Sequence, residues 1–210
     1  MVDTLRLDPA LPLIICDADE VLLQFMAGLE RYLHRKGLYI ELASFRIHGN
    51  VRDQNSHAQI ADEAVSGLIA GFFASDTASL EPVAGAADAL ENLSRHAQIL
   101  VLSNLPASAR QARIDNLVGH RMPYPVIAGA GPKGAIVQKI VAGICAPVVF
   151  IDDLPPHHTS VAAATPHVHR LHFVADKRLA KLIDASPDAH ARIDTWPEAE
   201  HWIRSALSTG

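Results

Sequence analysis

Cysteine is scarce in this sequence, with two residues among 210. Two thiols are too few for the disulfide framework of a small secreted domain. Cys16 and Cys145 both lie in or beside apolar runs. We therefore expect free, buried thiols in a protein of a reducing compartment.

An excess of basic residues is also absent, since the formal net charge is −5 at pH 7. Binding through nucleic-acid phosphates needs a basic face, so the composition argues against it. No apolar run approaches the roughly 20 residues that cross a bilayer. The first residues have neither the basic start nor the long apolar segment of a signal peptide. We expect a cytoplasmic protein that binds neither nucleic acid nor membrane.

What the sequence does contain is a series of short apolar runs separated by helical patterns. The runs that predict strands are 13–16, 97–103, 124–129, 146–152 and 167–174, with a short edge strand at 191–194. They are continuous rather than alternating, as in parallel strands covered on both faces. Helices are predicted at 84–96, 107–118, 133–143 and 159–164, and after a capping-box sequence at 195–198. The fold class that follows is α/β, a Rossmann-like parallel sheet flanked by helices.

Residues 24–81 interrupt this alternation. Helical patterns at 26–36 and 57–73 flank the polar run SFRIHGNVRDQNS, and no strand pattern stands out between them. Pro82 and Gly85 mark the return to the core. We predict a small all-helical insert at 24–81 within a core formed by 1–23 and 82–210.

Polar side chains follow four of the predicted strands. Asp17 and Asp19 follow the first, Ser103-Asn104 ends the second, Lys133 comes after the third, and Asp152-Asp153 ends the fourth. Ligands of open parallel sheets bind outside the carboxyl ends of the strands, so these groups are expected to share one crevice.

That set of groups suits a metal ion beside a phosphate. Carboxylates from two strand ends are ligands that Mg²⁺ prefers, and a hydroxyl with a lysine suits phosphate oxygens. Each group alone has a plainer interpretation. Acidic residues such as Asp17, Asp19 and Glu20 can cap the following helix, and a strand-terminal Ser or Lys is usually structural or solvated.

Taken in order, these motifs resemble those of the haloacid dehalogenase-like superfamily: Asp17-Ala18-Asp19, then Ser103, Lys133 and Asp152-Asp153. The resemblance covers the core and the position of the insert, which is similar to the cap domain of that family. It also covers LEPVAGAADALENL, residues 80–93, which leads from the insert to the second strand.

The resemblance implies a role for each motif residue. Asp17 would be the nucleophile that forms an aspartyl-phosphate, and Asp19 the general acid and then the base. Ser103, Asn104 and Lys133 would bind phosphate oxygens. The implied Mg²⁺ ligands are Asp17, the backbone carbonyl of Asp19, and Asp153, with Asp152 acting through water.

Asp19 separates the reactions found within the family, and two other positions depart from its common pattern. Asp19 favours phosphoryl transfer over dehalogenation, because members that displace halide from carbon need no proton donor there. Glu20 stands where many members have glycine, which could narrow the site. Gly134 stands where proline is commoner after the lysine, which leaves the reach of Lys133 open.

Substrate choice is expected to depend on the insert. Arg46, His48 and Arg52 in its polar run are candidates for gripping a second anionic group, although the same run would also suit an ordinary solvated loop. Gln24 and Phe25 could line the entrance. The histidine pairs 157–158 and 167/169 lack the further ligands of a zinc site, so surface or partly buried positions are expected.

The function predicted from these motifs is a Mg²⁺-dependent phosphatase that acts on a small phosphorylated metabolite. The alternatives are a phosphotransferase or phosphomutase of the same family, and a catalytically idle binding protein with the same fold.

Overall fold

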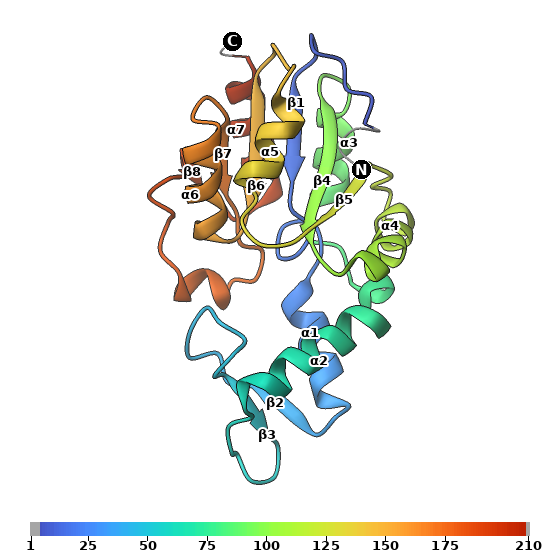
Figure 1. Ribbon diagram of the computed structural model, residues 1–210, viewed down its shortest axis with the longest axis vertical. Helices are drawn as coiled ribbons and strands as arrows, with labels where there is room; N and C mark the ends of the chain where they lie inside the picture. The colour runs from blue at the N-terminus through green and yellow to red at the C-terminus, as the bar shows by residue number, and fades with distance from the viewer. Residues whose placement is uncertain (1–4, 209–210) are drawn as a thin grey trace.

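Six parallel strands form the central sheet, in the order β5-β4-β1-β6-β7-β8. The computed structural model describes residues 5–208, so residues 1–4 and 209–210 of the predicted core lie outside it. The strand bounds are β1 Leu13–Cys16, β4 Gln98–Asn104, β5 Val126–Gly129, β6 Val148–Asp152, β7 His169–His172 and β8 Ala191–Arg192. This parallel sheet flanked by helices confirms the predicted α/β fold class (Figure 1).

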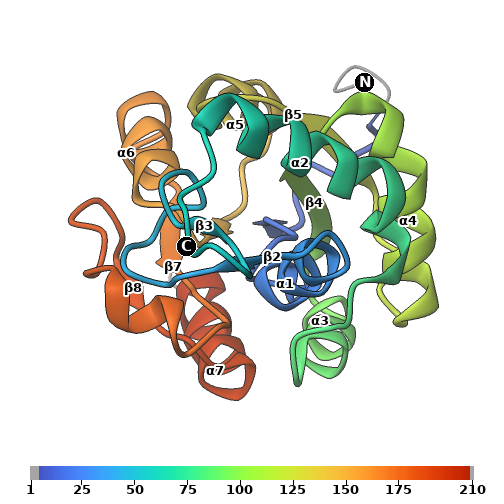
Figure 2. The ribbon, with the colours of Figure 1, turned by 90° about the horizontal axis from the view of Figure 1, so that it is seen from below.

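Alternate residues of the central strands pack into two separate cores, one on each face of the sheet. In β1, Leu13 and Ile15 belong to one core and Ile14 and Cys16 to the other, and all four are fully buried. Helices α5 (Gly134–Val141) and α6 (Pro155–Ala164) pack together on the first face. Helices α3 (Ala86–Leu93) and α7 (Trp196–Leu207) pack together on the second (Figure 2). Burial on both faces explains why the apolar runs are continuous.

The insert lies beyond the carboxyl ends of the strands, at the bottom of Figure 1. It holds helices α1 (Phe25–His34) and α2 (Asp62–Ser75), but it also holds a two-stranded antiparallel sheet of β2 (Leu38–Ile40) and β3 (Val51–Asp53). The expectation of an all-helical insert is therefore wrong. Each strand has only three residues, and β3 includes the polar Arg52 and Asp53, so neither strand is long enough for an apolar pattern to be recognised in the sequence.

Several element boundaries also differ from the prediction. Helix α6 begins at Pro155 rather than at 159, because the fixed φ of proline suits the first turn of a helix. Helix α2 begins at Asp62 rather than at 57, since His57 adopts a left-handed conformation with φ +56°. Helix α4 (Arg110–Gly119) follows a single 3-10 turn at Ala107–Ala109.

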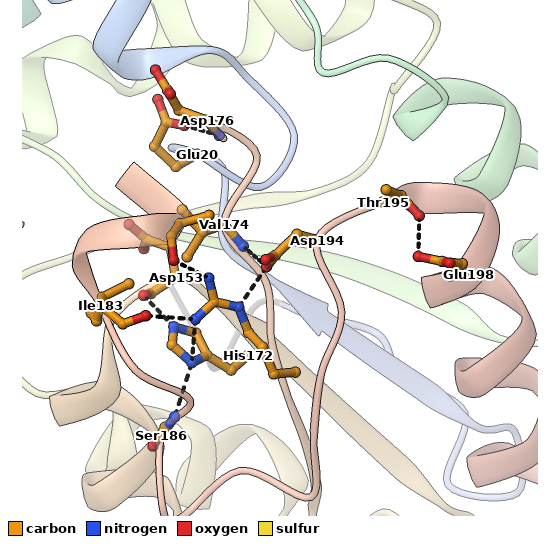
Figure 3. Close-up of polar contacts among 12 residues, drawn as sticks. Glu20, Asp153, His172, Val174, Asp176, Ile183, Ser186, Asp194, Thr195 and Glu198 are labelled. Atoms are coloured by element: carbon orange, nitrogen blue, oxygen red, sulfur yellow. Dashed lines mark hydrogen bonds and ion pairs between the residues drawn. The ribbon is translucent and has the colours of Figure 1, made fainter. Parts of the chain in front are cut away.

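Two smaller expectations need correction. Cys145 is exposed, because it lies in the connection before β6, whereas Cys16 is buried in β1. At the start of α7, the Thr195 hydroxyl bonds the Glu198 carboxylate at 2.6 Å and makes no bond to the helix backbone (Figure 3). Within residues 5–208, no helix combines the length and the apolar character needed to cross a membrane.

Candidate active site

Three carboxylates meet at the carboxyl edge of the sheet. Strand β1 pairs with both β4 and β6, with Cys16 opposite Val101 and Ile151. This register places Asp17 beside the end of β6, and the Asp17 N–H donates to the Ile151 carbonyl at 2.8 Å. One carboxylate oxygen from each of Asp17, Asp152 and Asp153 lies within 4.8 Å of the others, and all three residues are buried.

Lys133 lies against this acidic group. Its Nζ is 2.7 Å from Asp17 Oδ1 and donates a hydrogen bond to Asp152 Oδ2 at 2.6 Å. The side chain is 1 % exposed, so the two carboxylates replace the water that would otherwise surround its charge. The other Asp152 oxygen accepts from the Leu154 N–H at 2.9 Å, which fixes that carboxylate from the opposite side.

The glycine after Lys133 has a packing role. A Cβ on Gly134 would lie 2.1 Å from the Ser160 carbonyl oxygen, because α5 and α6 approach closely there. The Gly134 N–H also donates to the Ser160 hydroxyl at 3.0 Å. Gly134 therefore sets the position of α5, and with it the reach of the lysine at the start of that helix.

Burial without enough positive charge raises the pKa of the acidic residues. The pKa of Asp17 is raised because burial outweighs the opposing effect of Lys133. The pKa of Asp153 is raised well above its usual range, first by burial and then by the charges of Asp152 and Asp17. Lys133 has a raised pKa, since these two neighbouring carboxylates outweigh the effect of its burial. The site therefore favours binding of a further cation.

Asp19 pairs with an arginine from α4. Arg113 Nη2 lies 2.7 Å from Asp19 Oδ1, and the arginine side chain is fully buried while Asp19 is 17 % exposed. Nε and Nη1 of Arg113 make no hydrogen bond within the described chain. Burial raises the pKa of Asp19, and the Arg113 charge opposes that rise. Arg113 thus holds Asp19 from behind while the carboxylate faces the site.

Ser103 and Asn104, at the end of β4, bring further polar atoms to the site. Ser103 is fully buried and, unlike Asn104, is not among the residues that line the cavity above these groups. Neither its hydroxyl nor Asn104 Oδ1 has a hydrogen-bond partner among residues 5–208. The Asn104 amide donates to the Gly131 carbonyl at 2.9 Å and lies 3.3 Å from His157 Nε2. Buried polar atoms without partners are costly, and a bound oxyanion would satisfy the hydroxyl of Ser103.

Glu20 links the loop after β1 to the insert. Its backbone has φ +56°, in the left-handed region that glycine adopts readily. A glutamate at this position adopts a backbone conformation that is uncommon for residues with a side chain. One carboxylate oxygen accepts from the Met26 N–H in the first turn of α1 at 2.6 Å. The other accepts from the Asp176 N–H at 3.0 Å (Figure 3). Burial raises the pKa of Glu20 to about 7. Its carboxylate therefore links the first turn of α1 to the core through two backbone hydrogen bonds.

Two histidines bond the backbone carbonyls of Asp152 and Asp153. His158 Nε2 donates to the Asp152 carbonyl at 3.0 Å. His172 Nε2 donates to the Asp153 carbonyl at 2.9 Å, while its Nδ1 accepts from the Ser186 N–H (Figure 3). Both rings are fully buried, and burial lowers the pKa of each to about 4. The expectation of a surface or partly buried residue is thus wrong for His157 and His158, which are both buried. His167 and His169 lie outside any group of three potential metal ligands found within residues 5–208.

A cavity of about 360 Å³ opens over these groups, between the core and the insert. Asp17, Asp19, Asn104, Lys133 and Asp153 line its core side. Of the insert residues named from the sequence, Phe25, Arg46 and His48 line the cavity. Arg52 does not, because its guanidinium bonds Glu41 and Gln59 at 2.9 Å each. Gln24 also lies outside the cavity, with its amide bonded to the Pro82 carbonyl.

One site residue that was not predicted, Arg113, does have a signal in the sequence. Arg113 falls on the buried stripe of α4 with Asn116 and Leu117, where a charge is unusual in the absence of a buried partner. The contacts of Glu20 with Asp176, and of His172 with Asp153, join segments far apart in the chain, and no local pattern announces them.

No protein-family model matches this sequence, and the search of curated proteins gave no match. Solved structures do match. A hydrolase from Deinococcus radiodurans R1, described as a HAD family hydrolase with bound phosphate and sodium, has a TM-score of 0.64 at 14% identity, over 97% of this chain and 100% of that one. The chain has the fold of the haloacid dehalogenase-like hydrolases.

Other members of this fold group have different described ligands and reactions. The HAD-hydrolase YfnB from Bacillus subtilis, solved bound to magnesium, has a TM-score of 0.63 at 11% identity, over 92% of this chain and 99% of that one. The L-2-haloacid dehalogenase from Xanthobacter autotrophicus has a TM-score of 0.62 at 12% identity, over 92% and 98%. Fold likeness therefore leaves the reaction to be argued from the site.

Proposed function

We propose that this protein is a Mg²⁺-dependent phosphatase that hydrolyses a small phosphorylated metabolite through an aspartyl-phosphate on Asp17. The observation that carries the proposal is the meeting of Asp17, Asp152 and Asp153 within 4.8 Å beside the buried Lys133. Three buried acids with one lysine leave negative charge uncompensated, which supports a cation at this position.

The donor set fits Mg²⁺, because every candidate ligand is an oxygen. Asp17, Asp153 and the backbone carbonyl of Asp19 would hold the ion, with Asp152 acting through water, since Lys133 and the Leu154 N–H occupy its carboxylate. The magnesium-bound hydrolase of the same fold supports this assignment. When bound, the ion would neutralise charge on the transferring phosphoryl group.

The residues of the chain then divide the chemical work. An Asp17 carboxylate oxygen attacks phosphorus, and the bond from phosphorus to the leaving oxygen breaks as Asp19 supplies a proton. Asp19 next takes a proton from water, whose oxygen attacks the same phosphorus and releases phosphate and free Asp17. Lys133, Ser103 and Asn104 bind the phosphate oxygens throughout. The phosphate recorded in the Deinococcus hydrolase supports such an anion site.

Halide displacement from carbon by Asp17 is the second candidate reaction. It draws support from the dehalogenase of the same fold and from the Arg113–Asp19 ion pair, which engages the proton donor that phosphoryl transfer would use. The presence of Asp19 at the cavity still favours phosphoryl transfer, because halide leaves carbon without protonation.

The test measures phosphate release from p-nitrophenyl phosphate with Mg²⁺, with EDTA, and by the Asp17→Asn variant. We expect Mg²⁺-dependent turnover and a loss on the order of 10⁴-fold or more in the variant, as for removal of other enzymatic nucleophiles. Asp62→Asn, at the exposed start of α2, is the matched control and should keep wild-type activity. Turnover indifferent to EDTA would refute the metal assignment.

Two further measurements address the alternative reactions. Halide release from an L-2-haloacid without phosphate release from the ester would favour the second candidate. Phosphoryl transfer to a sugar without release of free phosphate would indicate a phosphotransferase.

A further inference from the structure

Six of the eight insert residues that line the cavity are apolar. We define the insert wall as Phe25, Met26, Phe45, Ile47, Ile69 and Phe73, all of which line the cavity. Leu154 and Leu179 continue the apolar lining from the core. The Phe25 ring contacts the rings of Phe72 and Phe73, with centroids 5.3 and 5.8 Å away, so the aromatic part of this wall is packed in place.

Besides the groups assigned to the cation and the phosphate, four polar side chains line the cavity: Glu20, Arg46, His48 and His157. His157 Nε2 lies 3.3 Å from the Asn104 amide. Both oxygens of Glu20 already accept backbone hydrogen bonds. Arg46 and His48 are exposed, and His48 Nε2 is bonded to the Ser66 hydroxyl at 3.0 Å. A sugar or polyol enclosed here would lose the water on its hydroxyl groups without regaining hydrogen bonds from the apolar side chains, which is unfavourable.

We infer that the substrate is a phosphate monoester of an apolar alcohol, with an aliphatic or aromatic group seated against the insert wall. This inference rests on the proposed function and specifies its substrate class. The cavity of about 360 Å³ falls within the range of small-molecule sites, so a hydrocarbon group of several carbons fits beside the phosphate. Burial of that group would supply binding energy that a sugar phosphate could not.

A homologous series tests the inference, because primary alkyl esters differ in apolar length and hardly in leaving group. Binding of ethyl- to hexylphosphonate, which cannot be hydrolysed at the P–C bond, is measured by calorimetry with Mg²⁺, and kcat/KM is measured for the matching alkyl phosphates. Both are expected to rise about fourfold per methylene, as for a buried CH₂ group, until the wall is filled. Glycerol phosphate and glucose 6-phosphate are expected at least about tenfold below pentyl phosphate in kcat/KM.

Ile47→Asn places a polar group of similar size in the insert wall and is expected to flatten the dependence of affinity on chain length. Val118→Ser is the matched control, because Val118 is an exposed apolar residue of α4, 52% accessible, away from the cavity. An affinity that does not change with chain length, or a preference for sugar phosphates, would overturn the inference even if turnover occurs. Affinity that climbs while no phosphate is released from any ester would instead refute the proposed function and leave the apolar site standing.

Discussion

The core side and the insert side of the cavity differ in charge, in burial and in how they are fixed. On the core side, Asp17, Lys133 and Asp153 are each at most 8% exposed. Asp17 and Asp153 directly follow strands β1 and β6, and Lys133 directly precedes helix α5. On the insert side, Phe45 and Ile47 are partly buried and come from the connection between β2 and β3. Strand register and buried ion pairs position the first set, whereas loop packing positions Phe45 and Ile47 beside the helical residues of the insert wall. This difference is consistent with the proposal that the reaction takes place on the core side and that the insert selects the substrate.

Lys133→Met would break the core side most severely. Removing the cation leaves Asp17 and Asp152 buried without their partner, and the loss of one member of a buried ion pair typically costs about 3–5 kcal/mol of unfolding free energy. We expect that loss in urea unfolding at pH 7.5 without Mg²⁺. Protonation of a carboxylate relieves the repulsion, so the deficit should shrink as the pH falls.

Lys139→Met is the control for this variant, because Lys139 is an exposed residue of the same helix. It should change the unfolding free energy by less than about 0.5 kcal/mol. Equal stability of the two variants would show that the core carboxylates do not depend on Lys133.

Arg113 allows the core side to be tested for chemistry apart from stability. If Arg113 positions Asp19 as proton donor, Arg113→Lys should lower kcat/KM about a hundredfold for alkyl phosphates, whose leaving groups need a proton. For p-nitrophenyl phosphate, whose leaving group departs without one, the loss in kcat/KM should be about tenfold smaller. The measurement is the ratio of the two kcat/KM values in each protein, because kcat also includes hydrolysis of the intermediate that both esters share. Equal losses for both esters would indicate a purely structural role for the arginine.

The fold was largely predictable because its signals are local. Continuous apolar runs such as 13–16 and 146–152 predicted buried parallel strands, and the structure confirms the fold class. The parallel order of those strands then brings Asp17 and Asp153 together, so proximity at the site followed from topology. Strands β2 and β3 were missed because their pairing, not their composition, defines them.

The supporting contacts of the site could not be predicted in the same way. The Arg113–Asp19 pair and the His172–Asp153 bond depend on which helix or strand lies behind which carboxylate, and neither is encoded by spacing. Glu20 stood out as a departure from the family pattern, but its bonds to Met26 and Asp176 appear only once the insert and the core are placed together.

His158 offers the mildest test of the core side, because it acts on Asp152 through the backbone. Its pKa is lowered to about 4 in the folded protein from 6.5, so the unfolded chain binds more protons between those two values. Stability conferred by the neutral ring is therefore complete above pH 6.5 and is lost as the pH falls toward 4. At pH 5 the loss amounts to about 2 kcal/mol.

His158→Gln keeps an N–H donor for the Asp152 carbonyl and removes this titration. The difference in unfolding free energy between wild type and variant should therefore move by about 2 kcal/mol in favour of the variant between pH 7 and pH 5. Urea unfolding at both pH values measures it, with His201→Gln on the exposed face of α7 as the control that keeps the wild-type profile. A constant difference would mean that His158 is protonated as readily in the folded protein as in the unfolded chain. The hydrogen bond to the Asp152 carbonyl would then come from a ring that water reaches, and the core side would not differ from the insert side in this respect.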